Sequence, residues 1–146
     1  MISPGDPQLR SIGEPGGRGL ILYDGVCVLC SGWVRFVASR DVDRRFLFTP
    51  IQSDYGRALA LKHGIDTDNP QSNAVLVDGT VNLRSDSAIA ALSRLPGYGW
   101  VRGFRVIPQP LRDWAYAIVA RNRYRWFGRH DACDIGGAKY MDRVIG

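Results

Sequence analysis

The chain has 146 residues, of which 45% are hydrophobic and 23% charged, a composition typical of globular proteins and unlike that of disordered ones. The net charge is +5, and residues 98–129, with seven arginines and a single acid, alone carry +6. Three cysteines are too few for a disulfide-stapled scaffold, and no apolar run approaches the roughly 18 residues of a membrane span.

Residues 1–18 contain several prolines and glycines and no apolar stretch, a pattern that argues against a secretory signal and predicts a mobile tail. The length of the remainder, 19–146, suits a single domain. We therefore expect a cytoplasmic protein. In that compartment closely spaced cysteines are more often redox-active or metal-binding than structural.

The first four elements are predicted between residues 19 and 64. The continuous apolar run Gly19 to Tyr23, ended by Asp24-Gly25, indicates a strand buried on both faces. Apolar residues at helical spacing predict an amphipathic helix from about Val28 to Arg40. A second strand is expected at Arg45 to Ile51, followed by a helix that Ser53 caps and Gly64 ends.

The next three elements complete a recognisable order. The apolar run at residues 74–77 predicts a third strand. Asp78-Gly79 is typical of a hairpin turn, which predicts an antiparallel strand at 81–83. Ser85 or Asp86 is expected to cap a helix that Pro96-Gly97 closes. The order β-α-β-α-β-β-α is that of a thioredoxin-like α/β fold with a core of the glutaredoxin type.

From about residue 98 onward the pattern is helical again, and it is broken at Pro108 and Pro110. Apolar residues at helical spacing from Leu111 to Asn122 predict one helix that runs to about Trp126, with Gly128 as its terminator. We therefore expect the single domain to carry a helical C-terminal extension.

Cys27 and Cys30 are the candidate reactive residues, because they stand where the first strand gives way to a helix. Two cysteines three apart on a helix lie roughly 5.4 Å apart along its axis, within the Cα separation of about 4.4 to 6.8 Å that a disulfide allows. Cys30 is in phase with the apolar stripe of its helix and should be shielded. Cys27 precedes the helix, where free N–H groups and the helix dipole favour a thiolate.

These positions predict a division of labour in thiol–disulfide exchange, in which Cys27 attacks a substrate disulfide and Cys30 resolves the mixed disulfide. The alternative is that both cysteines are small residues of the core. Asp24 stands three residues before Cys27. Two interpretations of it are equally supported: it carries a proton to or from the cysteine pair, or it is an ordinary Asp-Gly turn former.

The strand-to-helix segment reads Tyr23-Asp24-Gly25-Val26-Cys27-Val28-Leu29-Cys30. It resembles the DCC family of predicted thiol-disulfide oxidoreductases, whose name refers to an Asp and two Cys residues matched here by Asp24, Cys27 and Cys30. The resemblance implies a thioredoxin-like fold and exchange with a protein or small-molecule disulfide or thiol, without naming a substrate. It continues through Trp33 to Val37, Phe46 to Ser53, Ser85 to Ala88, Ile107-Pro108, Leu111 to Asp113, Ala120 to Arg129 and Cys133.

Two features depart from what the resemblance implies. Thioredoxin-like proteins usually carry a cis-proline just before the third strand, facing the cysteines and binding the substrate backbone. Here that position falls at about Asn73, and Pro70 lies three residues earlier, so we expect an altered or absent substrate platform. The last dozen residues, which follow Cys133, carry no expectation from the family.

A zinc site is the first alternative, since Cys27, Cys30, Cys133 and His130 are suitable ligand types. We disfavour it because the chain has no second CxxC and because Cys30 belongs to an apolar stripe. Cys133 is better interpreted as a buried hydrophobic residue, with a regulatory disulfide to Cys27 as a further possibility. We therefore expect no metal and no cofactor beyond the redox-active Cys27–Cys30 disulfide.

A non-enzymatic binding module is the second alternative. Between Arg121 and Arg129 four arginines alternate with Tyr124, Trp126 and Phe127, a combination that can stack on nucleic acid or lie on an anionic membrane surface. We favour the interpretation that the aromatic residues pack this helix onto the core while the arginines are solvated. We therefore expect no nucleic-acid partner.

Overall fold

The computed structural model describes residues 18–25, 28–41, 45–65, 73–77, 79–127 and 143–145, with the backbone alone at 28–29, 31, 123–124 and 127. Residues 1–17 of the predicted tail therefore lie outside the described residues. No helix in the described part of the chain is long and apolar enough to cross a membrane.

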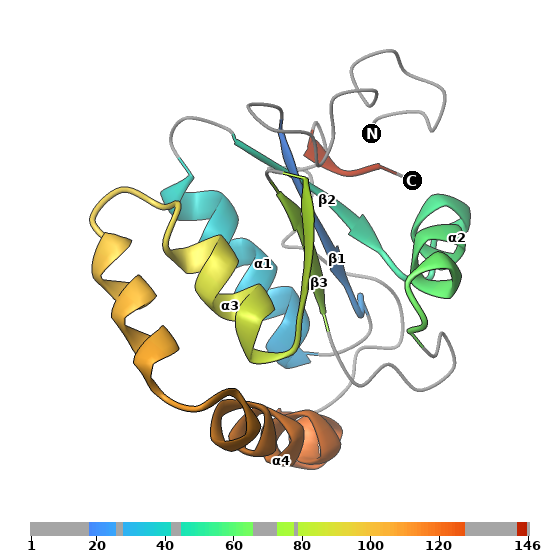
Figure 1. The fold of residues 1–146 in the computed structure, drawn as a ribbon. Helices are drawn as coiled ribbons and strands as arrows, with labels where there is room; N and C mark the ends of the chain where they lie inside the picture. Colours follow the sequence, from blue (N-terminus) through green and yellow to red (C-terminus); the bar gives the residue numbers. More distant parts are fainter. Residues whose placement is uncertain are drawn as a thin grey trace.

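Four strands form one sheet in the order β2-β1-β3-β4 (Figure 1). β1 (Gly19–Tyr23) pairs in parallel with β2 (Phe46–Pro50) and antiparallel with β3 (Ala74–Val77). β3 continues through the predicted hairpin into β4 (Thr80–Leu83), and Gly79 takes the positive φ of 76° that the turn requires. This sheet and the helices around it confirm the thioredoxin-like fold.

Helices cover both faces of the sheet. α1 (Val28–Arg40) and α3 (Ser85–Leu92) lie together on one face, and α2 (Asp54–Lys62) covers the other (Figure 1). All five residues of β1 are buried, as the continuous apolar run predicted, because alternate side chains enter the two cores. Ile21 and Tyr23 pack with α1 and α3, whereas Leu22 packs on the side of α2.

The second helix begins and ends where the sequence predicted. The Ser53 side chain accepts a hydrogen bond of 3.0 Å from the backbone N–H of Gly56, which satisfies one of the open donors of the first turn. Gly56 packs so closely on the end of β2 that a Cβ at this position would clash with the carbonyl oxygen of Pro50. Gly64 follows the helix with a φ of +75°.

The predicted cap of α3 is wrong. The residue that precedes the helix is Arg84, whose φ is 54°, and no side chain caps the first turn. Ser85 instead donates a hydrogen bond to Asp113, and Asp86 forms an ion pair with Arg112. Both side chains are thus directed to the helix that follows later in the chain, and they are not available to the backbone of α3.

The C-terminal extension is helical, as predicted. A 3₁₀ helix, η2 (Gly99–Val106), leads through Pro108 into α4 (Gln109–Phe127). Pro110 does not interrupt the helix a second time. It lies in the first turn of α4, where the backbone N–H has no intrahelical hydrogen bond to lose. The expectation that aromatic residues pack this helix onto the core is wrong for Trp126, whose side chain is exposed.

The end of the chain returns to the sheet, which the sequence did not predict. Val144 forms a parallel bridge with Phe48, and the N–H of Ile145 donates to the carbonyl oxygen of Phe48 at 2.8 Å. The buried side chain of Arg143 forms an ion pair with Asp41 at the end of α1. These residues cover the edge of β2 that no other strand pairs with in the described part of the chain.

Candidate active site

Cys30 lies in the first turn of α1, and its position confirms one part of the sequence interpretation. Its side chain is 8% exposed and shares the inner side of the helix with Val34 and Val37, which belong to the core between α1 and the sheet. The strand-to-helix context is also present, because β1 ends at Tyr23 and α1 begins at Val28. Cys27 itself lies outside the described residues, so its exposure and its attacking role stay predictions.

Asp24 is not an exposed turn residue, because its side chain is only 1% exposed. The Nε2 of Gln52 donates a hydrogen bond of 2.7 Å to the Oδ1 of Asp24. The Oε1 of the same Gln52 amide accepts a hydrogen bond of 2.9 Å from the N–H of Gly25. Gln52 thus holds both the carboxylate and the following peptide in place, directly before the cysteine motif.

Parallel pairing explains why Gln52 reaches this site. Tyr23 lies opposite Pro50, and the N–H of Ile51 donates to the carbonyl oxygen of Tyr23 at 2.8 Å. The residues that follow β1 and β2 therefore meet at the same edge of the sheet. Sequence reasoning treated Gln52 only as part of a family segment, although the end of a parallel partner strand was the signal that could have singled it out.

The position expected to hold a substrate platform lies at the same edge. Ala74 of β3 pairs with Leu22 of β1, which brings Asn73 close to the end of β1. The backbone N–H of Asn73 donates a hydrogen bond of 3.1 Å to the hydroxyl of Tyr116, a residue of α4. A side chain from the C-terminal extension therefore accepts the backbone N–H at the position where thioredoxin-like proteins usually carry a cis-proline, and the sequence did not predict the role of Tyr116.

Two of the segments that carried the family resemblance meet between α3 and α4. The guanidinium of Arg112 donates to the Oδ1 of Asp86 at 2.8 Å, to the Oγ of Ser85 at 3.1 Å and to the carbonyl oxygen of Ile107 at 3.0 Å. The Ser85 hydroxyl in turn donates to Asp113. We call these four side chains, Ser85, Asp86, Arg112 and Asp113, the α4 anchor, because they fix the first turn of α4 on α3.

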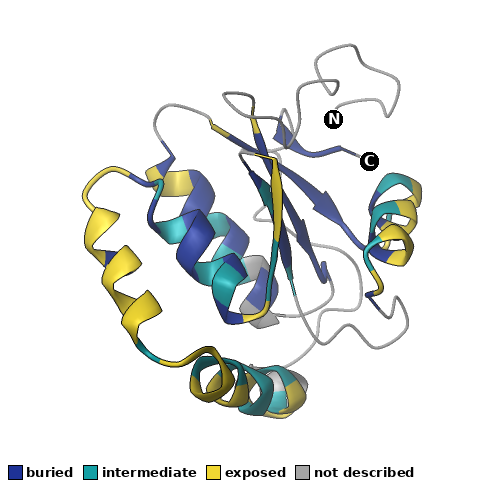
Figure 2. Cartoon of the chain, viewed as in Figure 1, coloured by how far each residue is buried: buried dark blue, intermediate teal, exposed yellow. Residues whose placement is uncertain are grey.

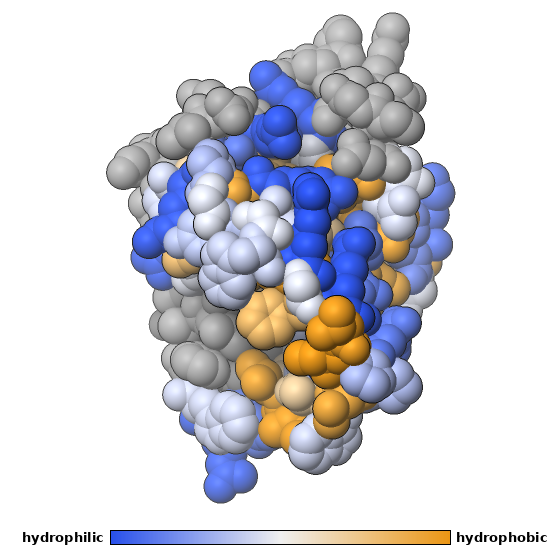
Figure 3. All heavy atoms as spheres, turned by 60° about the vertical axis from the view of Figure 1, so that its left-hand side comes forward, coloured by the Kyte–Doolittle hydropathy of each residue, from blue (hydrophilic) through white to orange (hydrophobic). Residues whose placement is uncertain are grey.

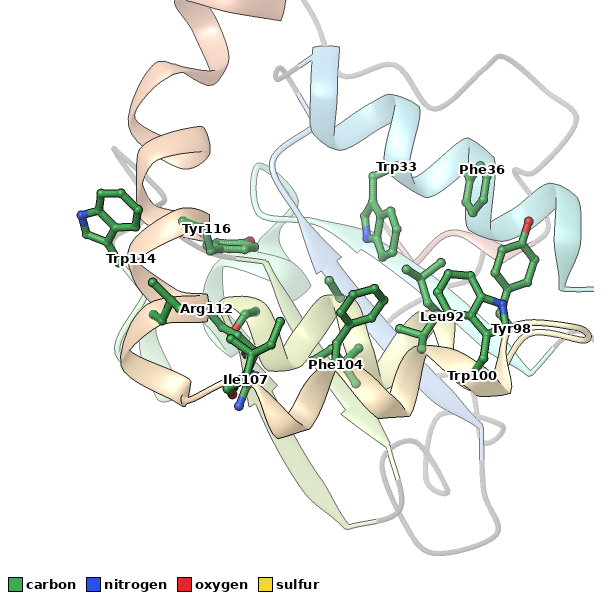
Figure 4. Close-up of a pocket in the computed structure, with 16 residues that line it drawn as sticks. Trp33, Phe36, Leu92, Tyr98, Trp100, Phe104, Ile107, Arg112, Trp114 and Tyr116 are labelled. Atoms are coloured by element: carbon green, nitrogen blue, oxygen red, sulfur yellow. Dashed lines mark hydrogen bonds between the residues drawn. The ribbon is translucent and has the colours of Figure 1, made fainter.

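Residues of α1, α3, η2 and α4 line an apolar groove of about 700 Å³ (Figure 4). Trp33 stands one turn after Cys30 and projects into the groove, and its ring stacks on Phe36 with the centroids 6.3 Å apart. Tyr116 projects into it from α4, whereas Trp114 lies at its outer edge. The volume is typical of small-molecule sites.

The remaining ligands of the alternative zinc site, Cys133 and His130, lie outside the described residues. Within the described ranges no group of three or more His, Cys, Asp or Glu side chains could hold a metal ion. The structure thus describes a buried cysteine in the first turn of α1 and, after the last residue of β1, a buried carboxylate held by an amide.

Comparison with known proteins identifies the family. A family model described as DCC1-like thiol-disulfide oxidoreductase matches residues 21–129. The chain is 40% identical over 127 residues to the uncharacterized protein YuxK of Bacillus subtilis (strain 168), covering 86% of this chain and 93% of that protein. It is 33% identical over 130 residues to the chloroplastic DCC family protein At1g52590 of Arabidopsis thaliana, covering 88% of this chain and 76% of the relative. No solved structure matches. The chain belongs to the DCC1-like thiol-disulfide oxidoreductase family.

Proposed function

We propose that this protein exchanges thiols and disulfides through a dithiol formed by Cys27 and Cys30. The observation that carries the proposal is the buried Cys30 in the first turn of α1, directly after a buried strand, in a chain of this family. The open N–H groups of that turn favour a thiolate at the residue that precedes the helix. This supports Cys27 as the attacking residue.

In the proposed reaction the Cys27 thiolate attacks one sulfur of a substrate disulfide. A Cys27–substrate disulfide forms, the substrate S–S bond breaks, and the departing thiolate takes up a proton. Cys30 then gives up its proton and attacks the Cys27 sulfur, which releases the second substrate thiol and leaves a Cys27–Cys30 disulfide. The substrate gains two electrons, and an external dithiol returns two electrons to the protein. The same steps in reverse oxidise a substrate dithiol.

Asp24 is proposed as the proton carrier for these steps. Its carboxylate is buried and stands three residues before Cys27, at the end of β1. The bond from Gln52 fixes its orientation, so Gln52 acts as a positioning residue. A buried carboxylate in this place can accept the proton of the resolving thiol and return it to a leaving thiolate. The substrate is a protein or small-molecule disulfide or thiol.

Cysteine variants test the core of the proposal. Cys30→Ser should accumulate the Cys27–substrate adduct, which mass spectrometry of the non-reduced protein detects after mixing with a peptide disulfide. Cys27→Ser should lose disulfide reduction and form no adduct. Cys133→Ser is the matched control and should retain both the rate and the disulfide between Cys27 and Cys30. A Cys27→Ser protein that reduces the peptide at the normal rate would overturn the assignment.

The role of Asp24 is tested separately with Asp24→Asn, which keeps the shape of the side chain and removes its ability to carry the proton. We expect the exchange rate to fall roughly 10²-fold or more, as for the loss of a general acid–base group, and its pH profile to lose one limb. Gln52→Leu should lower the rate less, because the carboxylate remains and loses only the bond that orients it. A pH profile of Asp24→Asn that superposes on the wild type would leave Asp24 as a turn former.

A further inference from the structure

An exposed apolar patch lies on η2 and on the start of α4. Its most exposed members are Val106, Trp100 and Trp114, with 86%, 65% and 62% of their surfaces accessible. Soluble monomers rarely present so many large apolar side chains in one place without a binding role. We define the apolar patch as Trp100, Phe104, Val106, Leu111 and Trp114.

The apolar patch is continuous with the groove described above. Trp100, Phe104 and Leu111 are exposed and also line the groove, and Trp33 and Phe36 line it on the side of α1 (Figure 4). The space between the helices therefore opens onto this patch. An apolar group that entered the groove from the patch would contact aliphatic and aromatic side chains of α1 and of η2.

Cationic side chains stand within the part of the patch that lies on η2. Arg102 and Arg105 stand between the apolar residues of η2, and both are exposed. The only acid between residues 98 and 129 is Asp113, whose carboxylate accepts the Ser85 hydroxyl in the α4 anchor. Figure 3, which faces the side of the molecule that carries η2, shows hydrophobic residues gathered together and flanked by hydrophilic ones.

We propose that the apolar patch docks on the surface of an anionic lipid bilayer. Exposed tryptophan, phenylalanine and aliphatic side chains beside arginines are the combination that lies at a bilayer interface, where the apolar groups enter the acyl region and the cations meet lipid phosphates. Nucleic acid would supply the anions, but it has no hydrocarbon to receive Val106, the most exposed residue of the patch. The proposal is independent of the redox chemistry of Cys27 and Cys30.

Vesicle flotation of the full chain tests the proposal. Vesicles that mix phosphatidylglycerol with phosphatidylcholine should carry the protein upward, and pure phosphatidylcholine should carry much less. Each arginine near an anionic surface contributes roughly a fivefold change in affinity, so Arg102→Gln combined with Arg105→Gln should weaken binding roughly twenty-five-fold. Val106→Ser should weaken it roughly tenfold by removing an aliphatic group from the interface. Added salt should weaken the wild type and have little further effect on the arginine variant.

α2 offers matched controls on the opposite face of the sheet. Leu61 is 64% exposed and Arg57 is also exposed, so Leu61→Ser and Arg57→Gln remove the same chemistry from a different surface. Both controls should float as the wild type does. The proposal is overturned if the wild type fails to bind anionic vesicles, or if the control and patch variants weaken binding equally. It is also overturned if the patch variants abolish self-association or oligonucleotide binding while flotation is unchanged.

Discussion

The sheet and the C-terminal helices of this protein are stabilised in different ways. Every residue of β1 and β2 is buried, and the apolar clusters on both faces of the sheet join α1, α2 and α3 to it. In α4, by contrast, no described side chain is buried, and in η2 only Val101 is (Figure 2). The core is therefore held mainly by apolar burial, which is cooperative across the sheet.

α4 is held in large part by polar contacts. The α4 anchor joins it to α3, and the bond between Tyr116 and Asn73 joins it to the loop before β3. A hydrogen bond contributes only about 0.5 to 1.5 kcal/mol net. We therefore expect α4 to separate from the rest of the domain at a free-energy cost below that of global unfolding, as is common for elements with few buried apolar contacts. This bears on the active-site edge, because Tyr116 reaches it from α4.

The largest effect is expected from Arg143→Met, which breaks the buried ion pair with Asp41. Arg143 also donates to the carbonyl oxygens of Ala38 and Phe46, so its loss leaves a buried carboxylate and open acceptors. Breaking a buried pair costs about 3–5 kcal/mol. Urea denaturation should show this as a lower midpoint of one cooperative transition. Because the pair lies in the core, protection from amide exchange should fall across the whole sheet.

Two further variants decide whether the ion pair is the cause. Arg57→Met removes an exposed arginine from α2 and should change the free energy of unfolding by less than about 0.5 kcal/mol. Asp41→Asn added to Arg143→Met should restore part of the stability, since the unpaired buried charge is then gone. An Arg143→Met protein as stable as Arg57→Met would mean that the C-terminal residues are not part of the core.

A smaller and more local effect is expected from Arg112→Met. This change removes the contacts with Asp86, Ser85 and the carbonyl oxygen of Ile107. The ion pair with Asp86 is partly exposed to solvent. We expect a loss of about 1–3 kcal/mol that appears as faster amide exchange in α4, with the exchange of β1 and β3 unchanged. Arg112→Lys should give an intermediate result, because an ammonium cannot reproduce the fork of donors. Equal loss of protection in α4 and in the sheet would show that the two regions unfold as one.

The features that the sequence predicted are those with a local cause. The apolar run of β1, the cap by Ser53 and the in-phase burial of Cys30 each depend on residues a few positions apart. Gln52 and Arg143 were missed because their partners lie 28 and 102 positions away, and no periodicity encodes such contacts.

The cap of α3 failed for a related reason. Ser85 and Asp86 satisfy the local rule for a helix start, but the tertiary contacts of the α4 anchor use their side chains instead. The chemistry of the site was more accessible to sequence reasoning than its geometry. The cysteine spacing suggested thiol–disulfide exchange, whereas the amide that holds Asp24 becomes visible only when the ends of β1 and β2 are brought together.

The smallest predicted effect concerns Tyr55, which lies on the α2 side of the core and packs against the cluster of Leu20, Leu47 and Ile145. Burial raises the pKa of Tyr55 above its usual value of 10.0. The folded state therefore holds the phenolic proton more tightly than the unfolded state does. Below about pH 10 both states keep the proton, so the contribution to stability is constant. At higher pH the unfolded chain ionises first, and the contribution is lost as the pH rises through the folded-state pKa.

The free energy of unfolding should therefore fall as the pH rises above about 10, and that of Tyr55→Phe should fall less steeply over the same range. Urea titrations of both proteins measure this difference, and absorbance of the phenolate follows the titration directly. Since Tyr55 packs against the buried cluster of Leu20, Leu47 and Ile145, its ionisation should lower protection in the sheet and make the difference between the sheet and α4 smaller. If the free energy of unfolding fell equally with pH in the two proteins, the Tyr55 hydroxyl would be accessible to water. That result would weaken the contrast between a sheet buried on both faces and a loosely attached α4.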